Sequence, residues 1–233
     1  MSQFTLEHVK KLSAGLGEPQ WMLDFRLNAW EIYENTPMPV TSDEEWRRTD
    51  LRRLKLDQIG PSVNGDAATG VTIPDFLGGQ LTEDEAGGNM LQIDGVVEQY
   101  QLSESLQDQG VIFCDMHTAV RDYPDLVKKH FMTKGVPVTE GKFAALHGAF
   151  WRGGTFLYVP KNTQASAPLH TVLWSASGKT FTHTLVVLED GSEAIFMDEY
   201  ASADGQGQAL HNGVIELLVG DNASLIYAGL QDF

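Results

Sequence analysis

The chain has 233 residues, an apolar content of 42% and five tryptophans, which is typical of a folded globular protein and excludes a disordered one. Its 16 basic and 32 acidic residues give a formal net charge of −16, and this charge disfavours nucleic acid and anionic membrane surfaces as partners. Cys114 is the only cysteine, so neither an intrachain disulfide nor a cysteine zinc cluster can form. Because no apolar run reaches signal-peptide or membrane-spanning length, we expect a cytoplasmic protein.

The first predicted elements are helices. Residues 18–33 place an aromatic or small apolar residue at every fourth position, which predicts a helix that packs along one stripe. Ser42, followed three residues later by Glu45, predicts a capping box that opens a short second helix carrying Trp46. Residues 60–90 are rich in glycine and acidic residues and predict loops around short strands.

The middle of the chain mixes both element types. Residues 111–113 predict a buried strand, Pro124 opens a helix, and residues 142–151 form a further helix. Only short strands are predicted beyond Gly153, at residues 155–159, 169–174, 183–188, 194–197, 213–219 and 225–227. We therefore divide the chain into a helical segment at 1–59, a mixed α/β segment at 60–152 and a strand-rich segment at 153–233.

The strand-rich segment contains a repeat. Residues 186–191 read VVLEDG and residues 217–222 read LLVGDN, an offset of 31 positions, and each block ends in a turn pair between two strands. Short strands with such turns fit a β-sandwich or a β-solenoid, and the repeat favours the solenoid. A solenoid end normally carries a cap, but the chain stops directly after a strand, so we expect its unpaired edge to drive dimerisation or aggregation.

Several segments resemble the SufB/SufD family of iron–sulfur cluster assembly proteins. They read EPQWMLDFRLNA at residues 18–29, EWRRTDL at 45–51, DLVKKHF at 125–131, KFAALH at 142–147, FWRGGTFLYVP at 150–160, TLVV at 184–187, EYAS at 199–202, HNGVIE at 211–216 and LQDF at 230–233. The opening segment resembles that of SufB and SufD alike, and the WRxTDL-like segment favours the SufD side of the family. Because the matches keep one order from residue 18 to the end, the resemblance covers almost the whole chain.

The resemblance implies a right-handed parallel β-helix flanked by helices, in a SufD-like scaffold subunit that pairs with a SufB-like partner and the ATPase SufC in a SufBCD complex. It implies no catalytic residue and no cofactor held by this chain, although the family handles iron–sulfur clusters. Family members continue through further rungs to a helical region that docks SufC, so we expect this chain to be an N-terminal portion. The signature residues, expected to be structural, are Trp21, Arg26, Trp46, Arg47, Thr49, Asp50, Lys142, Phe143, Trp151, Gly153, Gly154 and Tyr200.

Other residues bear chemistry of their own. Cys114 follows an apolar run, where a lone cysteine is more often a buried hydrophobe than a reactive thiol such as a persulfide carrier. His170, His183 and His211 are candidate metal ligands, although histidines satisfied by packing and hydrogen bonds are more common. The arginines at positions 26, 47, 48, 52 and 53 predict salt bridges that anchor the helical segment to the acidic body.

Two alternative functions remain open at this stage. A cupin-type metal-dependent β-barrel enzyme would use the three histidines with Glu189, but the usual His-x-His pattern is absent. A β-solenoid binding module without any cluster role is the other alternative, because a fold alone does not determine function.

Overall fold

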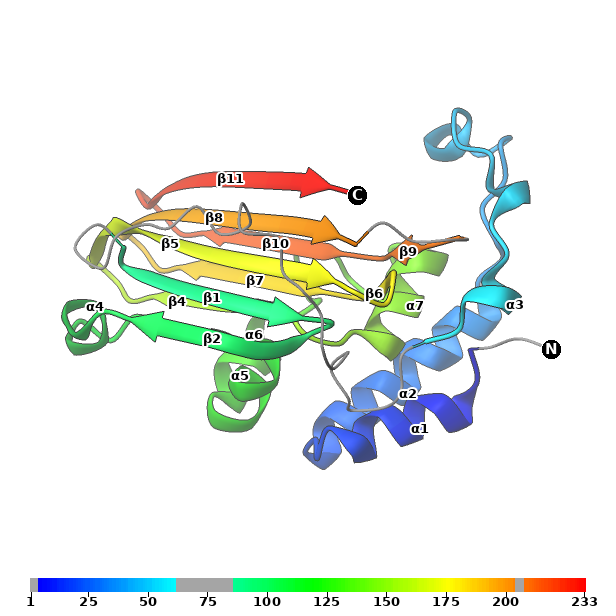
Figure 1. Ribbon diagram of the computed structural model, residues 1–233, viewed down its shortest axis with the longest axis horizontal. Coiled ribbons are helices and arrows are strands. Elements are labelled where there is room, and N and C mark those ends of the chain that lie inside the picture. Colours follow the sequence, from blue (N-terminus) through cyan, green and yellow to red (C-terminus); the bar gives the residue numbers. More distant parts are fainter. Residues whose placement is uncertain (1–3, 62–85, 204–207) are drawn as a thin grey trace.

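Two parallel-rich sheets, preceded and partly covered by helices, form the body of the chain (Figure 1). The computed structural model describes residues 4–61, 86–203 and 208–233. The helices are α1 Leu6–Gly15, α2 Gln20–Asn35, α3 Leu56–Ile59, α4 Glu104–Asp108, α5 Met116–Asp122, α6 Pro124–His130 and α7 Lys142–Phe150, with 3₁₀ turns η1 Glu44–Trp46 and η2 Leu51–Arg53. None of the helices in these ranges is both long and apolar enough to span a membrane.

The strands are β1 Gly88–Ile93, β2 Val96–Leu102, β3 Ile112–Asp115, β4 Thr155–Val159, β5 Gln164–Ser175, β6 Lys179–Thr180, β7 His183–Leu188, β8 Glu193–Ser202, β9 Leu210–His211, β10 Val214–Val219 and β11 Ser224–Asp232. One sheet has the order β11-β8-β5-β1-β2 and the other has the order β10-β7-β4-β3. From β4 onward the long strands alternate between the two sheets, and each pairs in parallel with the strand two places further along. The fold is therefore mixed α/β, with N-terminal helices.

The offset of the sequence repeat, 31 residues, equals the offset between residues that pair across neighbouring parallel strands. Val186 lies opposite Leu217 in the pair β7–β10, and Glu193 lies opposite Ser224 in β8–β11, each an offset of 31. Turn pairs at equivalent positions therefore stack. The backbone N–H of Gly191 donates to the Asp221 carbonyl at 2.9 Å.

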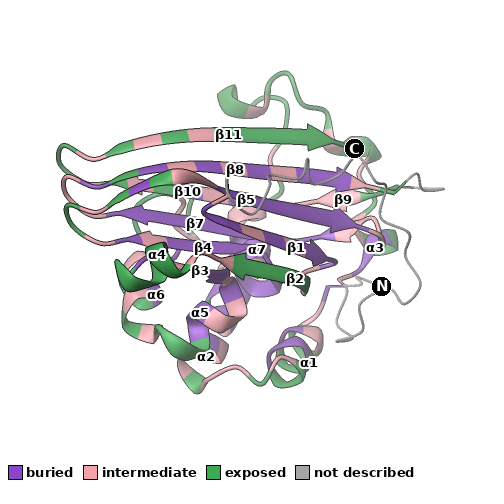
Figure 2. Ribbon diagram, turned by 60° about the vertical axis from the view of Figure 1, so that its left-hand side comes forward, coloured by how far each residue is buried: buried purple, intermediate pink, exposed green. Residues whose placement is uncertain are grey.

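The core lies between the two sheets. Leu169 and Phe196 from one sheet and Leu157 and Val186 from the other are fully buried in one apolar cluster. A second cluster joins Trp151 and neighbouring strand residues to α5 and α6, and a third joins α1, α2 and α7. Figure 2 shows the central strands as buried and β11 as largely exposed.

Most predicted strands are confirmed, but three features of the first half differ from expectation. The Ser42 capping box is wrong: η1 is one 3₁₀ turn with Asp43 at its N-cap, and the Asp43 carboxylate accepts from the Val40 N–H at 2.9 Å instead. The α1 helix and the β1–β2 hairpin were not predicted. The expected loops of residues 60–90 fall largely on residues 62–85, which lie outside the described ranges.

Candidate functional site

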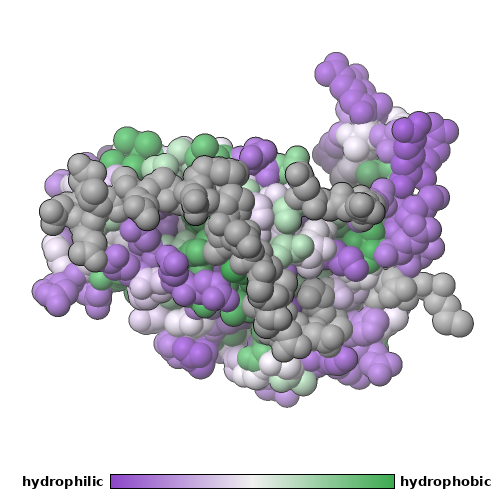
Figure 3. Space-filling view, viewed as in Figure 1, coloured by the Kyte–Doolittle hydropathy of each residue, from purple (hydrophilic) through white to green (hydrophobic). Residues whose placement is uncertain are grey.

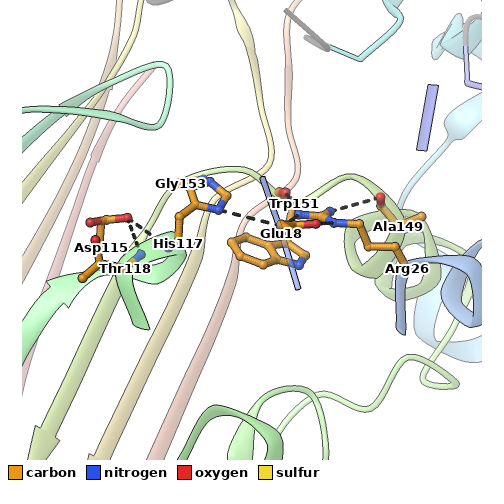
Figure 4. Close-up of polar contacts among 8 residues, drawn as sticks. All are labelled: Glu18, Arg26, Asp115, His117, Thr118, Ala149, Trp151 and Gly153. Carbon is orange, nitrogen blue, oxygen red and sulfur yellow. Dashed lines mark hydrogen bonds and ion pairs between the residues drawn. The ribbon is translucent and has the colours of Figure 1, made fainter. Parts of the chain in front are cut away.

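The signature residue Arg26 joins α2 to the C-terminal end of α7, just before the chain enters β4, and this contact is called the junction below (Figure 4). Its side chain is completely buried on α2 and forms two hydrogen bonds with the Glu18 carboxylate, from Nε at 2.7 Å and from Nη2 at 2.6 Å. The guanidinium also donates to the carbonyls of Ala149 at 3.2 Å and Trp151 at 3.0 Å. Because the last carbonyls of a helix lack partners within it, Arg26 satisfies the end of α7 while its charge is neutralised by Glu18.

Trp151 lies between this ion pair and α5. The Arg26 guanidinium is 4.6 Å from the Trp151 ring centroid, and the His117 ring stacks on Trp151 with centroids 4.8 Å apart. The Gly153 N–H donates to His117 Nε2 at 3.1 Å, so Nδ1 carries the proton and faces Glu18 at 4.0 Å. Burial, together with the charge of Arg26, lowers the pKa of His117 to about 4, so the ring is neutral at pH 7.

Two glycines lead the chain from Trp151 into β4. Gly153 and Gly154 have φ angles of +73° and +111°, which side-chain-bearing residues rarely adopt. A Cβ on Gly154 would lie 2.1 Å from the His183 carbonyl oxygen. The Gln92 side chain accepts from the Gly154 N–H at 2.9 Å and donates to its carbonyl at 2.8 Å. This segment therefore passes between the β1–β2 hairpin and β7 with no space for a side chain.

The remaining signature residues form separate contacts. Trp46 stacks on Phe143 with ring centroids 5.5 Å apart, and the Lys142 ammonium donates to a backbone carbonyl of α2. Trp21 lies beside Lys128, whose Nζ is 5.2 Å from the ring centroid. Thr49 is exposed.

Tyr200 belongs to a polar cluster between the sheets. Its hydroxyl donates to Asp198 Oδ2 at 2.7 Å, and the Thr184 hydroxyl donates to the same oxygen at 2.8 Å. Asp198 is fully buried and its Oδ1 has no hydrogen-bond partner among the described residues. Burial raises the pKa of Asp198 to about 6.

Arg26 anchors the helical segment through hydrogen bonds to two backbone carbonyls, whereas its salt bridge is with Glu18 in the same segment and not with the acidic body as predicted. Arg47 pairs with Glu44 and Arg52 pairs with Asp50, so both ion pairs stay within their own 3₁₀ turns. The Arg52 hydrogen bonds lower the pKa of the exposed Asp50 carboxyl to about 2. Arg48 and Arg53 form no ion pair with another residue in the described ranges. The predicted salt bridges to the body are therefore wrong for these four: Arg47 and Arg52 pair with exposed neighbours in sequence.

The candidate metal ligands do not converge. His170 lies 3.2 Å from Glu199, His211 lies 2.7 Å from Thr180, and His183 contacts His147 and Glu216. Within the described ranges, no group of three or more histidine, cysteine or acidic side chains is arranged to hold a metal ion. Glu189, expected beside the histidines in a cupin-type site, pairs instead with Lys129.

Cys114 lies on β3, at the wall of a surface groove of about 720 Å³ that also borders Tyr100 and Tyr123. The thiol is buried, and burial followed by the charge of Asp115 raises its pKa far above the ordinary value. The thiol is therefore protonated at neutral pH, which is the unreactive form of cysteine.

Sequence reasoning missed Glu18, Gln92 and His117 as members of the junction. The EPQW segment contained Glu18, but nothing in its spacing shows that it pairs with a residue eight positions later. Gln92 and His117 reach the junction through tertiary contacts with the glycine pair, and no local pattern marks them.

The chain was compared with known proteins. Residues 13–171 match the family model of the SufBD protein N-terminal region, and residues 172–233 match that of the SufBD core domain of the SUF system for FeS cluster assembly. The iron-sulfur cluster assembly protein SufD of Bacillus subtilis is 37% identical over 97% of this chain and 52% of that protein. SufB of the same organism is 30% identical over 98% of this chain and 50% of that protein.

A chloroplastic SufBD family protein of Arabidopsis thaliana is 29% identical over 100% of this chain and 43% of its own length. The chain thus spans about half the length of the curated relatives it matches. Since the two family models together cover residues 13–233, the chain belongs to the SufB/SufD family of iron–sulfur cluster assembly proteins.

Proposed function

We propose that this chain is part of a SufD-like scaffold subunit of a SufBCD complex and acts in iron–sulfur cluster assembly through contacts with a SufB-like partner and the ATPase SufC. The observation that carries this proposal is the similarity over nearly the whole chain, which is higher to SufD, at 37% identity, than to SufB of the same organism, at 30%. We propose a cytoplasmic location for the subunit, consistent with a single cysteine that is buried and unpaired.

The proposed role is non-catalytic. Arg26, Trp151, Gly153 and Gly154 are buried, closely packed and engaged with the chain itself, so their burial supports a structural role for these signature residues. Under this proposal no cofactor is held by these 233 residues. The region that docks SufC in the family would belong to sequence outside these residues, which is consistent with relatives about twice as long.

We propose that the strands from β4 to β11 are the rungs of a right-handed parallel β-helix, which occupies the segment 153–233 after a helical segment at 1–59 and a mixed segment at 60–152. The alternation of strands between two sheets and the offset of 31 residues in β7–β10 and β8–β11 support this proposal. The next rung would pair with the free edges of β10 and β11. Ile226 and Phe233, each 61% exposed, lie on the β11 side, where Figure 3 shows apolar atoms along the upper edge.

The cupin alternative has no support in this arrangement. Cupin barrels are double-sheet jelly rolls of antiparallel strands, whereas β4, β7 and β10 pair in parallel, as do β5, β8 and β11. The alternative of a binding module with the same fold and no role in cluster assembly is tested by the chimera described next.

The test is a chimera in which this chain replaces the matching half of SufD in a Bacillus subtilis strain depleted of its own SufD. We expect the chimera to restore the activity of an iron–sulfur enzyme, because the replaced half would supply the same scaffold. The same replacement made in SufB is the matched control and should restore less. A chimera that accumulates to the level of native SufD and restores no activity would contradict the proposal.

A further inference from the structure

A chain of three titratable side chains lies outside the Arg26 junction. His147 comes from α7, His183 from the start of β7 and Glu216 from β10, and their side chains are buried. His147 Nε2 lies 3.0 Å from His183 Nδ1, and His183 Nε2 lies 3.1 Å from Glu216 Oε2. At the other end, His147 Nδ1 lies 2.9 Å from the Asn212 carbonyl oxygen. Three consecutive pairs of polar atoms, each at hydrogen-bond distance, therefore connect the Asn212 carbonyl to the Glu216 carboxylate. The space between the two atoms of each pair, which one proton can fill, is called a gap below.

Each gap requires one proton, because two lone pairs facing each other at this distance repel. Two neutral imidazoles and an ionised carboxylate supply two protons in total, one from each ring. Every tautomer with two protons leaves at least one of the three gaps empty. Three protons fill all the gaps, and the group then has no net charge, which is also the arrangement that burial favours.

We propose that His147, His183 and Glu216 hold one proton in common, beyond those of two neutral imidazoles, and that this proton fastens residues 131–136 to β10. The Glu216 carboxylate accepts from the Met132 N–H at 2.7 Å and from the Val136 N–H at 3.0 Å. Met132 has a φ of +48°, an uncommon conformation for a side-chain-bearing residue that the contact with Glu216 helps to hold. Without the third proton His183 is neutral, so the ionised Glu216 lies in the interior without a counter-charge, and the segment that covers it opens to water.

The surrounding groups keep the third proton away from His147. Burial and the neighbouring His183 lower the pKa of His147, and Arg26 and His211 also disfavour charge on it. Burial lowers the pKa of His183, whereas its hydrogen bond to Glu216 raises it. His130 is the other titratable group that faces Glu216, and burial lowers its pKa as well. Burial raises the pKa of Glu216, but the hydrogen bonds that its carboxylate accepts from His183, Val136 and Met132 lower it further, so Glu216 is the ionised member. The third proton therefore lies on His183, which forms an imidazolium–carboxylate pair with Glu216.

The fastened segment contributes to the surface. Together with α2 and α6 it forms a hollow of about 290 Å³, lined by Trp21, Phe25, Lys128, Phe131, Met132 and Thr133. The protonation of a buried group thus controls the shape of an aromatic surface feature. The three side chains thus hold residues 131–136 against β10 at neutral pH and release them in alkaline solution.

The test is the pH dependence of the folding equilibrium constant of the 233-residue chain with Cys114→Ala, since a buried thiol would itself give a slope above pH 8. Above pH 7.5 the unfolded histidines are neutral, so folding takes up one proton and the constant falls by close to tenfold per pH unit up to pH 8.5. Adding Glu216→Gln abolishes the slope, because the uncharged amide leaves no buried carboxylate for a protonated His183 to neutralise. Adding Glu199→Gln, which changes the separate His170–Glu199 pair, leaves the slope intact.

A flat profile in the Cys114→Ala chain would overturn the proposal, as would a slope that survives Glu216→Gln. If the Glu216→Gln variant does not fold, hydrogen exchange of the backbone amides in the Cys114→Ala chain tests the proposal instead. The opening constants of the Met132 and Val136 amides should rise about tenfold per pH unit while that of Leu157 on β4 stays constant. Equal behaviour of the three amides would overturn the proposal.

Discussion

Replacement of Arg26 by methionine tests the junction between α2 and the C-terminal end of α7. Methionine keeps much of the side-chain length but removes the charge and all four hydrogen bonds. The Glu18 side chain is only 3% exposed, so its carboxylate would remain buried without a counter-charge. Breaking one side of a buried ion pair typically costs about 3–5 kcal/mol, and we expect Arg26→Met to lower the free energy of unfolding by this amount.

Equilibrium unfolding in urea, followed by tryptophan fluorescence, measures this loss. Adding Glu18→Gln to Arg26→Met removes the stranded charge, so the double variant should be more stable than the single one. The coupling energy between the two positions should be at least about 2 kcal/mol. Arg52→Met is the matched control, because the Arg52–Asp50 pair is exposed and its loss should leave the unfolding midpoint unchanged. A loss below about 1 kcal/mol for Arg26→Met, or additive effects in the double variant, would refute this account of the junction.

Three further changes test other parts of the molecule. Gly154→Ala should cost about 2–5 kcal/mol of stability in urea unfolding, because its Cβ meets the backbone of β7, and Gly141→Ala, with open space around it, should cost far less. Since burial raises the pKa of Asp198 to about 6, the folded chain binds this proton more tightly than the unfolded chain, and stability declines as pH rises from about 4 to 6. In the Asp198→Asn variant, the fall in the free energy of unfolding between these pH values should be smaller by about 3 kcal/mol. Parallel curves of unfolding free energy against pH for the variant and the wild type would contradict this. Ile226→Lys on the exposed face of β11 should weaken self-association in sedimentation velocity, whereas a strictly monomeric wild type would rule that association out.

The strand-rich half was largely predictable because its information is local and repeated. The VVLEDG and LLVGDN blocks predict both the strands and their offset, and the structure pairs Val186 with Leu217 at that offset. The β1–β2 hairpin was also within reach. Asp94 and Gly95, both with positive φ, form the two-residue turn between its strands, and an Asp-Gly pair of this kind is a strong hairpin signal in a sequence.

The junction and the histidine chain were not predictable to the same degree. Arg26 was expected to anchor the helical segment, yet its partners Glu18, Ala149 and Trp151 follow from how α2 meets α7 and not from sequence spacing. His147 and His183 lie 36 positions apart and come into contact only because α7 packs against the start of β7. Long-range contacts between different element types leave no periodic signal in one sequence.

The most direct test of the proposed scaffold role is recovery of SufB and SufC with a tagged version of the Bacillus subtilis chimera described above. The account predicts that both proteins co-purify in amounts close to those recovered with tagged native SufD, and that Arg26→Met in the chimera reduces the recovery together with the stability. A folded chimera at native abundance that recovers neither protein would contradict the account and favour a binding module with no role in cluster assembly.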